Sequence, residues 1–315
     1  MDEKSFKNYS ELITLLESRN IDFTSTSSKG TAKKHLQREG YYNLINGYKD
    51  MFLDSQGENY KDGTTVEEIY SLYEFDCELR NAIFESILRV ETNVKSLISY
   101  EFSKAHGHQN YLINSNFRND SLTAIKQSTE LISEAQRQVA NRVKDPSINH
   151  YLSKYGYVPL WVMNNILTFG TVSKFYSLML QKERQEVAKV FKIDEKTLES
   201  FLFYLSKIRN FCAHGNRLYC YRTQTPISNT PVHENLNIPI IKSEYTYGKR
   251  DLFACMIALR MLMSGENFDV LCDRVESAIT KLEASIQTIS IEDVLSSMGF
   301  PGSWKRIKRV SKKKK

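Results

Sequence analysis

Residues 64–102 read TTVEEIYSLYEFDCELRNAIFESILRVETNVKSLISYEF, and this stretch decides the fold class of the 315-residue chain. Thr64 and Thr65 stand three residues before Glu67 and Glu68, which is the spacing of a helix-capping box. The residues after them predict one amphipathic helix of about ten turns without Pro or Gly, ending near Phe102. Its apolar stripe consists of Ile69, Leu72, Leu79, Ile83, Ile87, Val90, Val94 and Leu97.

Shorter helical patterns flank this long helix on both sides. They predict helices over 9–19, 121–143, 250–263 and 268–288, and others that begin at Pro159, at Thr171 and after the cap Asp194. The segment 121–143 is mostly polar, so we expect it to cover the core from outside. No period-two alternation is strong enough for a sheet, and the sequence therefore predicts an all-α bundle.

Composition divides the chain into three parts. Residues 1–62 are predicted to form an N-terminal helical extension, which contains the tyrosine-rich motif YYNLINGYKDMF at 41–52. Residues 63–290 are predicted to form the main helical domain. Within it, three prolines among Asn and Ser residues predict a long irregular insertion at 223–248, which would hold a short hairpin. Residues 291–315 are predicted to be a basic C-terminal tail.

The net charge of +6 comes from the C-terminus. The last twelve residues, WKRIKRVSKKKK, carry eight basic groups, and without them 35 basic residues face 37 acidic ones. Such a run is usually solvated and disordered. Its functional alternative is a grip on nucleic-acid phosphates that does not depend on sequence. Binding to a membrane surface is disfavoured, because Trp304, Ile307 and Val310 make only a thin apolar face.

Several classes of protein are disfavoured by composition. With 41% hydrophobic residues the chain can build a core, yet it has no apolar run of about eighteen residues that would span a membrane. The polar N-terminus MDEKSFKNYS lacks a secretory signal, so a cytoplasmic protein is expected. Five cysteines without a C-x-x-C pair argue against disulfides and a zinc site. His106 and His108 fit a solvated helix end better than a metal site.

The candidate site lies in KIRNFCAHGNRLYCYR, residues 207–222. On a helix ending there, Arg209 falls within the apolar stripe, while Asn210 and His214 lie four residues apart on the other side. Arg209 and His214 diverge by about 140°. A guanidinium that faces the core needs a partner, for which Glu91 and Asp76 of the long helix are the candidates.

These residue types suit RNA cleavage. RNA carries its own nucleophile, the 2′-hydroxyl, so a protein has to move protons and stabilise the phosphorane charge. Histidine performs either proton transfer, and arginine suits the phosphate oxygens. Asn210 would fix the imidazole tautomer or hold a phosphate oxygen. Because one Arg–His pair makes a thin site, we expect a homodimer, or a higher assembly of dimers, with the motif at its interface.

Purely structural roles for Arg209 and His214 also fit the sequence. Arg209 would form only a buried ion pair, and His214 would be an ordinary histidine at a helix C-terminus before the stop Gly215. Spacing alone is a weak signal, since an Arg–His pair at this spacing arises by chance in about a third of chains with this many arginines and histidines.

Four ordered blocks resemble the Abi family of bacteriophage abortive-infection proteins, of the AbiD and AbiF type within the HEPN superfamily. They are YYNLINGYKDMF (41–52), YEFDCELRNAIFESILRVETNVKSLISYEF (73–102), VPLWVMNNILTFGTVSKFYSLM (158–179) and LSKIRNFCAHGNRLYCYR (205–222). The resemblance implies a helical HEPN core with metal-independent endoribonuclease chemistry at an R-N-x-x-x-H motif. Arg209, Asn210 and His214 match that motif, and no cofactor is implied. The family often carries a second histidine where this chain has Gly215.

The resemblance also implies antiviral defence, in which cleavage of cellular RNA halts the growth of an infected cell. Some relatives work with a small RNA as antitoxin or guide, so RNA is expected both as substrate and as regulator. A non-catalytic RNA-binding regulator that uses the same groove is the second hypothesis, and a structural partner module is the third. After the motif, Arg217 and Arg222 would hold the RNA strand, and Tyr219 or Tyr221 would stack on a base.

Overall fold

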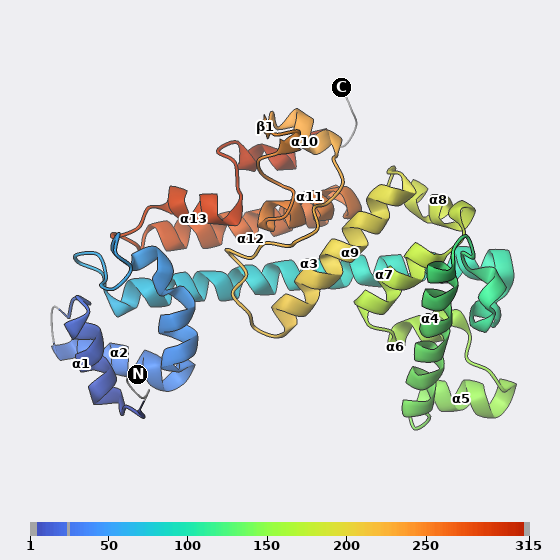
Figure 1. Ribbon diagram of the computed structural model, residues 1–315, viewed down its shortest axis with the longest axis horizontal. Coiled ribbons are helices and arrows are strands. Elements are labelled where there is room, and N and C mark those ends of the chain that lie inside the picture. The colour runs from blue at the N-terminus through green and yellow to red at the C-terminus, as the bar shows by residue number, and fades with distance from the viewer. Residues whose placement is uncertain (1–4, 24–25, 312–315) are drawn as a thin grey trace.

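The computed structural model describes residues 5–23 and 26–311, and its central element is α3 (Val66–His106). This helix of 41 residues runs along most of the length of the molecule (Figure 1). Its N-cap is Thr65, whose hydroxyl accepts a hydrogen bond from the Glu68 amide at 3.2 Å, as the capping pattern predicts. The long helix is confirmed, and it continues one turn beyond the predicted end at Phe102 before Gly107 terminates it.

The N-terminal elements gather at the first turns of α3 (Figure 1). They are α1 (Tyr9–Ser18), α2 (Thr26–Glu39), the π-helix η1 (Tyr42–Asn46) and the 3-10 helix η2 (Lys49–Phe52). The sequence reading missed α2, because its only fully buried apolar residues are Ala32 and Leu36, too few for a clear stripe. The ring of His35 on α2 stacks on Tyr70 of α3 with 3.7 Å between centroids.

Most of the middle of the chain surrounds the other end of α3 (Figure 1). Its elements are η3 (Asn110–Leu112), η4 (Asn114–Asn116), α4 (Leu122–Asn141), α5 (Pro146–Tyr155), α6 (Leu160–Ile166), α7 (Phe169–Leu178) and α8 (Gln181–Val190). Few of the α4 side chains are buried, so this helix covers the core from outside as predicted. Neither α5 nor α8 was predicted. The α8 sequence QKERQEVAKV is mostly polar, and Val187 and Ala188 are its only buried apolar residues.

The helix that carries the motif, α9 (Glu195–Ala213), packs on α3 and α7. Asp194 caps it by accepting a hydrogen bond from the Thr197 amide at 2.8 Å. The segment after α9 contains α10 (Pro231–Asn235) and one antiparallel hairpin of β1 (Ile240–Ile241) and β2 (Glu244–Tyr245), so the expected hairpin is present. Buried His233 bonds the Gly248 carbonyl at 2.8 Å, and burial lowers its pKa to about 4. The predicted insertion at 223–248 is therefore a packed part of the fold.

The C-terminal part lies along α3, with α12 beside it (Figure 1). It consists of α11 (Leu252–Leu262), α12 (Gly265–Glu283), α13 (Ile291–Met298) and the 3-10 helix η5 (Trp304–Lys308). The prediction of a solvated tail is wrong up to residue 311, because Trp304, Ile307 and Val310 are buried in the core. The Arg260 guanidinium also donates to the Ile307 carbonyl at 3.1 Å. The four lysines at 312–315 lie outside the described residues.

Buried apolar residues from Ile13 to Val310 form one core cluster, so the N-terminal helices and the C-terminal segment belong to the same folded body. The prediction of an all-α fold is confirmed, since the single two-stranded hairpin is the only sheet among the residues described. In the same part of the chain, no helix has both the length and the apolar composition needed to cross a bilayer.

Candidate active site

The motif occupies the last turn of α9. Arg209 and Asn210 lie within the helix, and His214 is its C-cap, with its backbone amide donating to the Asn210 carbonyl at 3.1 Å. Gly215 follows with a φ of +67°, a left-handed conformation that a side chain would strain. The side chains of Asn210 and His214 are exposed, and among the residues described they form no hydrogen bond or ion pair. The imidazole is therefore available to a ligand.

Arg209 is held against α3. Its Nε lies 3.6 Å from Oε2 of Glu91, and its guanidinium carbon lies 5.7 Å from the centroid of the Phe84 ring. The Arg209–Glu91 contact is an ion pair without hydrogen-bond geometry, because neither atom has a hydrogen-bond partner. Glu91 also pairs with Lys95, whose Nζ is 2.7 Å away. The Arg209 side chain stays 29% exposed, so its guanidinium is positioned and still reachable from solvent.

Asp76, the other predicted partner, does not contact Arg209. It lies fifteen residues before Glu91, which is about 22 Å along a helix, and other groups use its carboxylate. The Arg80 guanidinium, one turn further, donates to Asp76 in a close contact. The Tyr48 hydroxyl donates to Asp76 at 2.7 Å, and burial together with the Asp76 charge raises the pKa of Tyr48, which keeps it a donor.

The same carboxylate fixes the chain just after the motif. Asp76 accepts hydrogen bonds from the backbone amides of Leu218, at 3.0 Å, and Tyr219, at 2.7 Å. We call this arrangement of Tyr48, Asp76, Arg80 and the two amides the Asp76 clamp. It joins the tyrosine-rich motif, the long helix and the segment after α9. The clamp thereby fixes the end of α9, and with it the position of His214.

Comparison with known proteins assigns the chain to a family. Residues 34–220 match the family model of the Abi-like proteins, which is more than half of the chain. The chain belongs to the Abi-like protein family. No curated protein and no solved structure matches it. Membership of the family indicates a role in abortive infection. The matched region contains the whole Asp76 clamp and the Arg209–His214 motif, whereas α11, α12 and α13 lie beyond it.

The proposed RNA contacts after the motif are placed differently in this Abi-like protein than we expected. The prediction that Tyr219 stacks on a base is wrong, because its ring is buried and lies 6.1 Å from the Tyr48 ring. The alternative, Tyr221, packs on Phe211 with 4.0 Å between centroids.

The two arginines after the motif have protein partners. Arg217 donates to the Gly47 carbonyl and to Asp50, the latter at 3.1 Å. Arg222 lies 3.1 Å from Asp251, a carboxyl group whose pKa burial raises to about 6. A role of either arginine in holding RNA stays a prediction.

Sequence reasoning missed Tyr48 and Arg80 as parts of the site. A signal for Arg80 was present, since it follows Asp76 by four residues on the same helix face, which is ion-pair spacing. No comparable signal existed for Tyr48, which belongs to a family block full of tyrosines. Its contact with Asp76 spans 28 residues and depends on how η1 and η2 pack on α3.

Proposed function

We propose that this Abi-like protein is a HEPN-type, metal-independent endoribonuclease of the AbiD and AbiF kind that acts as an effector in anti-phage abortive infection. One observation carries the proposal. The His214 imidazole is exposed and unengaged at a helix end that the Asp76 clamp holds in place, five residues after Arg209, whose guanidinium is positioned. Such groups are typical of a site for moving protons at a phosphodiester.

The chemistry uses the nucleophile of the substrate. His214 removes the proton from the RNA 2′-hydroxyl, or returns one to the leaving 5′-oxygen. The 2′-oxygen attacks the adjacent phosphorus, the bond to the 5′-oxygen breaks, and a 2′,3′-cyclic phosphate remains. Arg209 stabilises the negative charge on the equatorial oxygens, which its planar donors suit. Asn210 orients the imidazole or holds a phosphate oxygen.

A second copy of the chain would complete this site. Phe203, Lys207, Asn210 and His214 are all exposed and follow one another at steps of four, three and four residues along one face of α9. That spacing suits packing against a partner helix, and Phe203 is 45% exposed although it is large and apolar. We propose a two-fold dimer, or an assembly of such dimers, in which the second His214 supplies the second proton-transfer group.

The dimer is tested by Phe203→Glu. Sedimentation equilibrium of the wild type should give about twice the chain mass of 36.6 kDa, or a multiple of that, and the variant should give the single-chain mass. The reason is that a charge in the middle of an apolar contact is costly to bury. Tyr42→Glu, at an exposed aromatic residue in η1, is the matched control and should leave the assembly unchanged. A monomeric wild type would contradict the composite site.

The catalytic proposal is tested by His214→Ala. Expression of the wild type should arrest growth, and the pure protein should cleave RNA. The variant should do neither, with a loss in cleavage rate of about 10²-fold or more, because it lacks the proton-transfer group. His150→Ala removes another exposed histidine and should behave as the wild type.

Three outcomes separate the hypotheses. Cleavage by His214→Ala at the wild-type rate would remove this residue from the site. A wild type that binds RNA with a steep salt dependence and leaves it intact would favour the non-catalytic regulator. We also propose that a bound small RNA controls the protein. A discrete small RNA that co-purifies with the protein would support this.

A further inference from the structure

A pocket of about 880 Å³ lies along the second half of α3, where α6 forms its other wall. We call it the α3 groove, and its lining includes Leu88, Glu91, Tyr100, Lys104, Trp161 and Asn164. One end reaches Glu91, the residue that contacts Arg209. From Leu88 to Lys104 the groove follows α3 for about 24 Å. It therefore begins beside the candidate active site and leads away from it.

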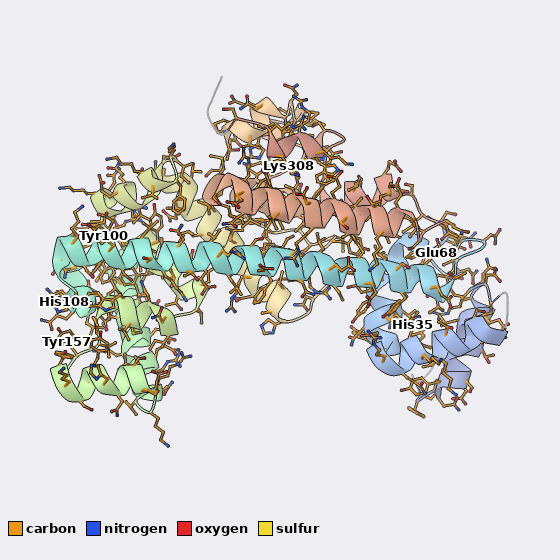
Figure 2. The ribbon with its side chains drawn as sticks, turned by 180° about the vertical axis from the view of Figure 1, so that it is seen from behind. His35, Glu68, Tyr100, His108, Tyr157 and Lys308 are labelled. Atoms are coloured by element: carbon orange, nitrogen blue, oxygen red, sulfur yellow. The ribbon has the colours of Figure 1, made fainter. Side chains whose placement is uncertain are left out.

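Flat aromatic surface is exposed in the α3 groove. Trp161 is 48% exposed and Tyr100 is 65% exposed, whereas many other large aromatic side chains are buried in the core. The Trp161 ring lies 5.7 Å from His108, which forms a 2.7 Å hydrogen bond with the Tyr157 hydroxyl. Figure 2 shows Tyr100, His108 and Tyr157 at the same end of the molecule. Exposed rings that are held from behind are the surfaces on which bases stack.

The polar groups of the groove include acceptors that lack donors. The Asn164 side chain is 1% exposed, and its Nδ2 donates to the Lys95 carbonyl at 3.1 Å and to Ser99 Oγ at 2.7 Å. Its Oδ1 has no hydrogen-bond partner among the residues described. Oε2 of Glu91 also accepts no hydrogen bond, although Arg209 Nε lies 3.6 Å from it. Such oxygens accept from N–H or O–H donors. A phosphodiester offers none, whereas every nucleobase has N–H groups.

A cation completes the α3 groove. The Lys104 side chain is 59% exposed, its ammonium pairs with Glu101 at 3.4 Å, and it lies 5.8 Å from the centroid of the Tyr100 ring. Beside a stacked base it would meet the phosphate of the same strand, which is the combination that proteins use for single-stranded nucleic acid. The groove is long enough for several nucleotides at about 3.4 Å each along a stacked strand.

We propose that the α3 groove binds single-stranded RNA and leads it to Arg209. Bases stack on Trp161 and Tyr100, and Asn164 Oδ1 accepts a hydrogen bond from a base. This proposal rests on the proposed ribonuclease function and assigns it a binding site for the strand. The aromatic faces and the lone acceptors together favour a ligand with bases over one that offers only negative charge.

The test measures RNA affinity in the His214→Ala background, where the RNA stays intact. The probe is a fluorescent single-stranded RNA of about 12 nucleotides and mixed sequence, compared with an abasic strand of the same length. Trp161→Ala and Tyr100→Ala should each raise the Kd for the base-bearing RNA roughly 5- to 150-fold, since a stacking ring is lost. Tyr42→Ala is the matched control, and it should change the Kd less than about twofold because this ring lies outside the groove.

A spectroscopic readout reports on stacking directly. The chain has two tryptophans, and Trp304 is buried, so RNA in the groove should quench the emission of Trp161. Trp161→Phe keeps an aromatic face and removes this reporter. It should therefore bind RNA nearly as well as the parent while the quenching disappears.

Each outcome bears on one proposal or the other. An unchanged Kd in both Trp161→Ala and Tyr100→Ala, with RNA still bound, overturns the groove and leaves the ribonuclease proposal standing. Equal losses for the abasic strand overturn base stacking. Weaker binding in both variants, together with a wild type that leaves RNA intact, supports the groove and contradicts the ribonuclease proposal. A wild type that binds neither probe and instead captures a peptide segment in the groove overturns both.

Discussion

Replacing Arg209 with alanine is expected to slow RNA cleavage by about 10²- to 10³-fold, because the variant loses donors that stabilise negative charge in the transition state. The structure leaves the guanidinium accessible to a phosphate. Glu91 and Phe84 hold it from one side, and 29% of the side chain is exposed on the other. The measurement is single-turnover cleavage at saturating enzyme, which separates the chemical step from RNA binding.

The stability of the same variant distinguishes a catalytic arginine from a structural one. Glu91 keeps Lys95 at 2.7 Å when Arg209 is removed, so its buried charge does not become unpaired. We therefore expect Arg209→Ala to lower the free energy of unfolding by about 1 kcal/mol, measured in urea. A purely structural ion pair predicts a loss of about 3 to 5 kcal/mol. A loss of that size, with cleavage falling only with the folded fraction, would contradict the catalytic role.

Two further variants control for charge. Arg89→Ala removes one exposed positive charge from α3, two residues before Glu91, and it should leave the chemical step nearly unchanged. Arg209→Lys keeps the charge but loses the planar pair of donors, so it should restore only part of the rate. If removal of the surface charge slows cleavage as much as Arg209→Ala does, and Arg209→Lys cleaves at the wild-type rate, net charge near the motif matters and the geometry of the guanidinium does not.

The helices that the sequence predicted correctly are those with many apolar residues at regular spacing. The apolar residues of α3 recur at helical spacing over about ten turns, so the sequence alone identifies this helix. The helices α2 and α8 are mainly polar, and each is held in the fold by the packing of two apolar residues. Two apolar residues do not make a period that identifies a helix from the sequence. The start of α5 could have been predicted from the sequence, since Asp145 followed by Pro146 is a helix cap and a first-turn proline.

The contacts of the candidate site residues could be predicted only in part from the sequence. Helical geometry placed Arg209 toward the core and left two carboxylates as partners, Glu91 and Asp76. The choice between them depends on where α9 crosses α3 along its length, and no local pattern contains that information. The same limit applies to Tyr219, whose ring is buried and whose amide donates to Asp76. In the C-terminal segment, the three-residue spacing of Trp304, Ile307 and Val310 indicated a buried face, but the density of charge hid it.

Replacing Asp76 with alanine is expected to lower the free energy of unfolding by about 3 to 5 kcal/mol. The variant leaves the largely buried Arg80 guanidinium without its carboxylate and removes the acceptor for Tyr48 and for two backbone amides. Urea unfolding measures the loss. Glu85→Ala is the matched control on α3, because Glu85 is exposed and pairs with surface arginines. It should cost about 1 kcal/mol or less.

A double variant separates the stability of the Asp76 clamp from its role in positioning His214. Asp76→Leu with Arg80→Met removes both buried charges and should recover part of the stability that Asp76→Ala loses. It should not recover RNA cleavage, since the amides of Leu218 and Tyr219 still lack an acceptor and the end of α9 is no longer fixed. Wild-type cleavage by a folded double variant would show that His214 needs no clamp. In that case, the contact between the tyrosine-rich motif and the segment after α9 serves stability alone.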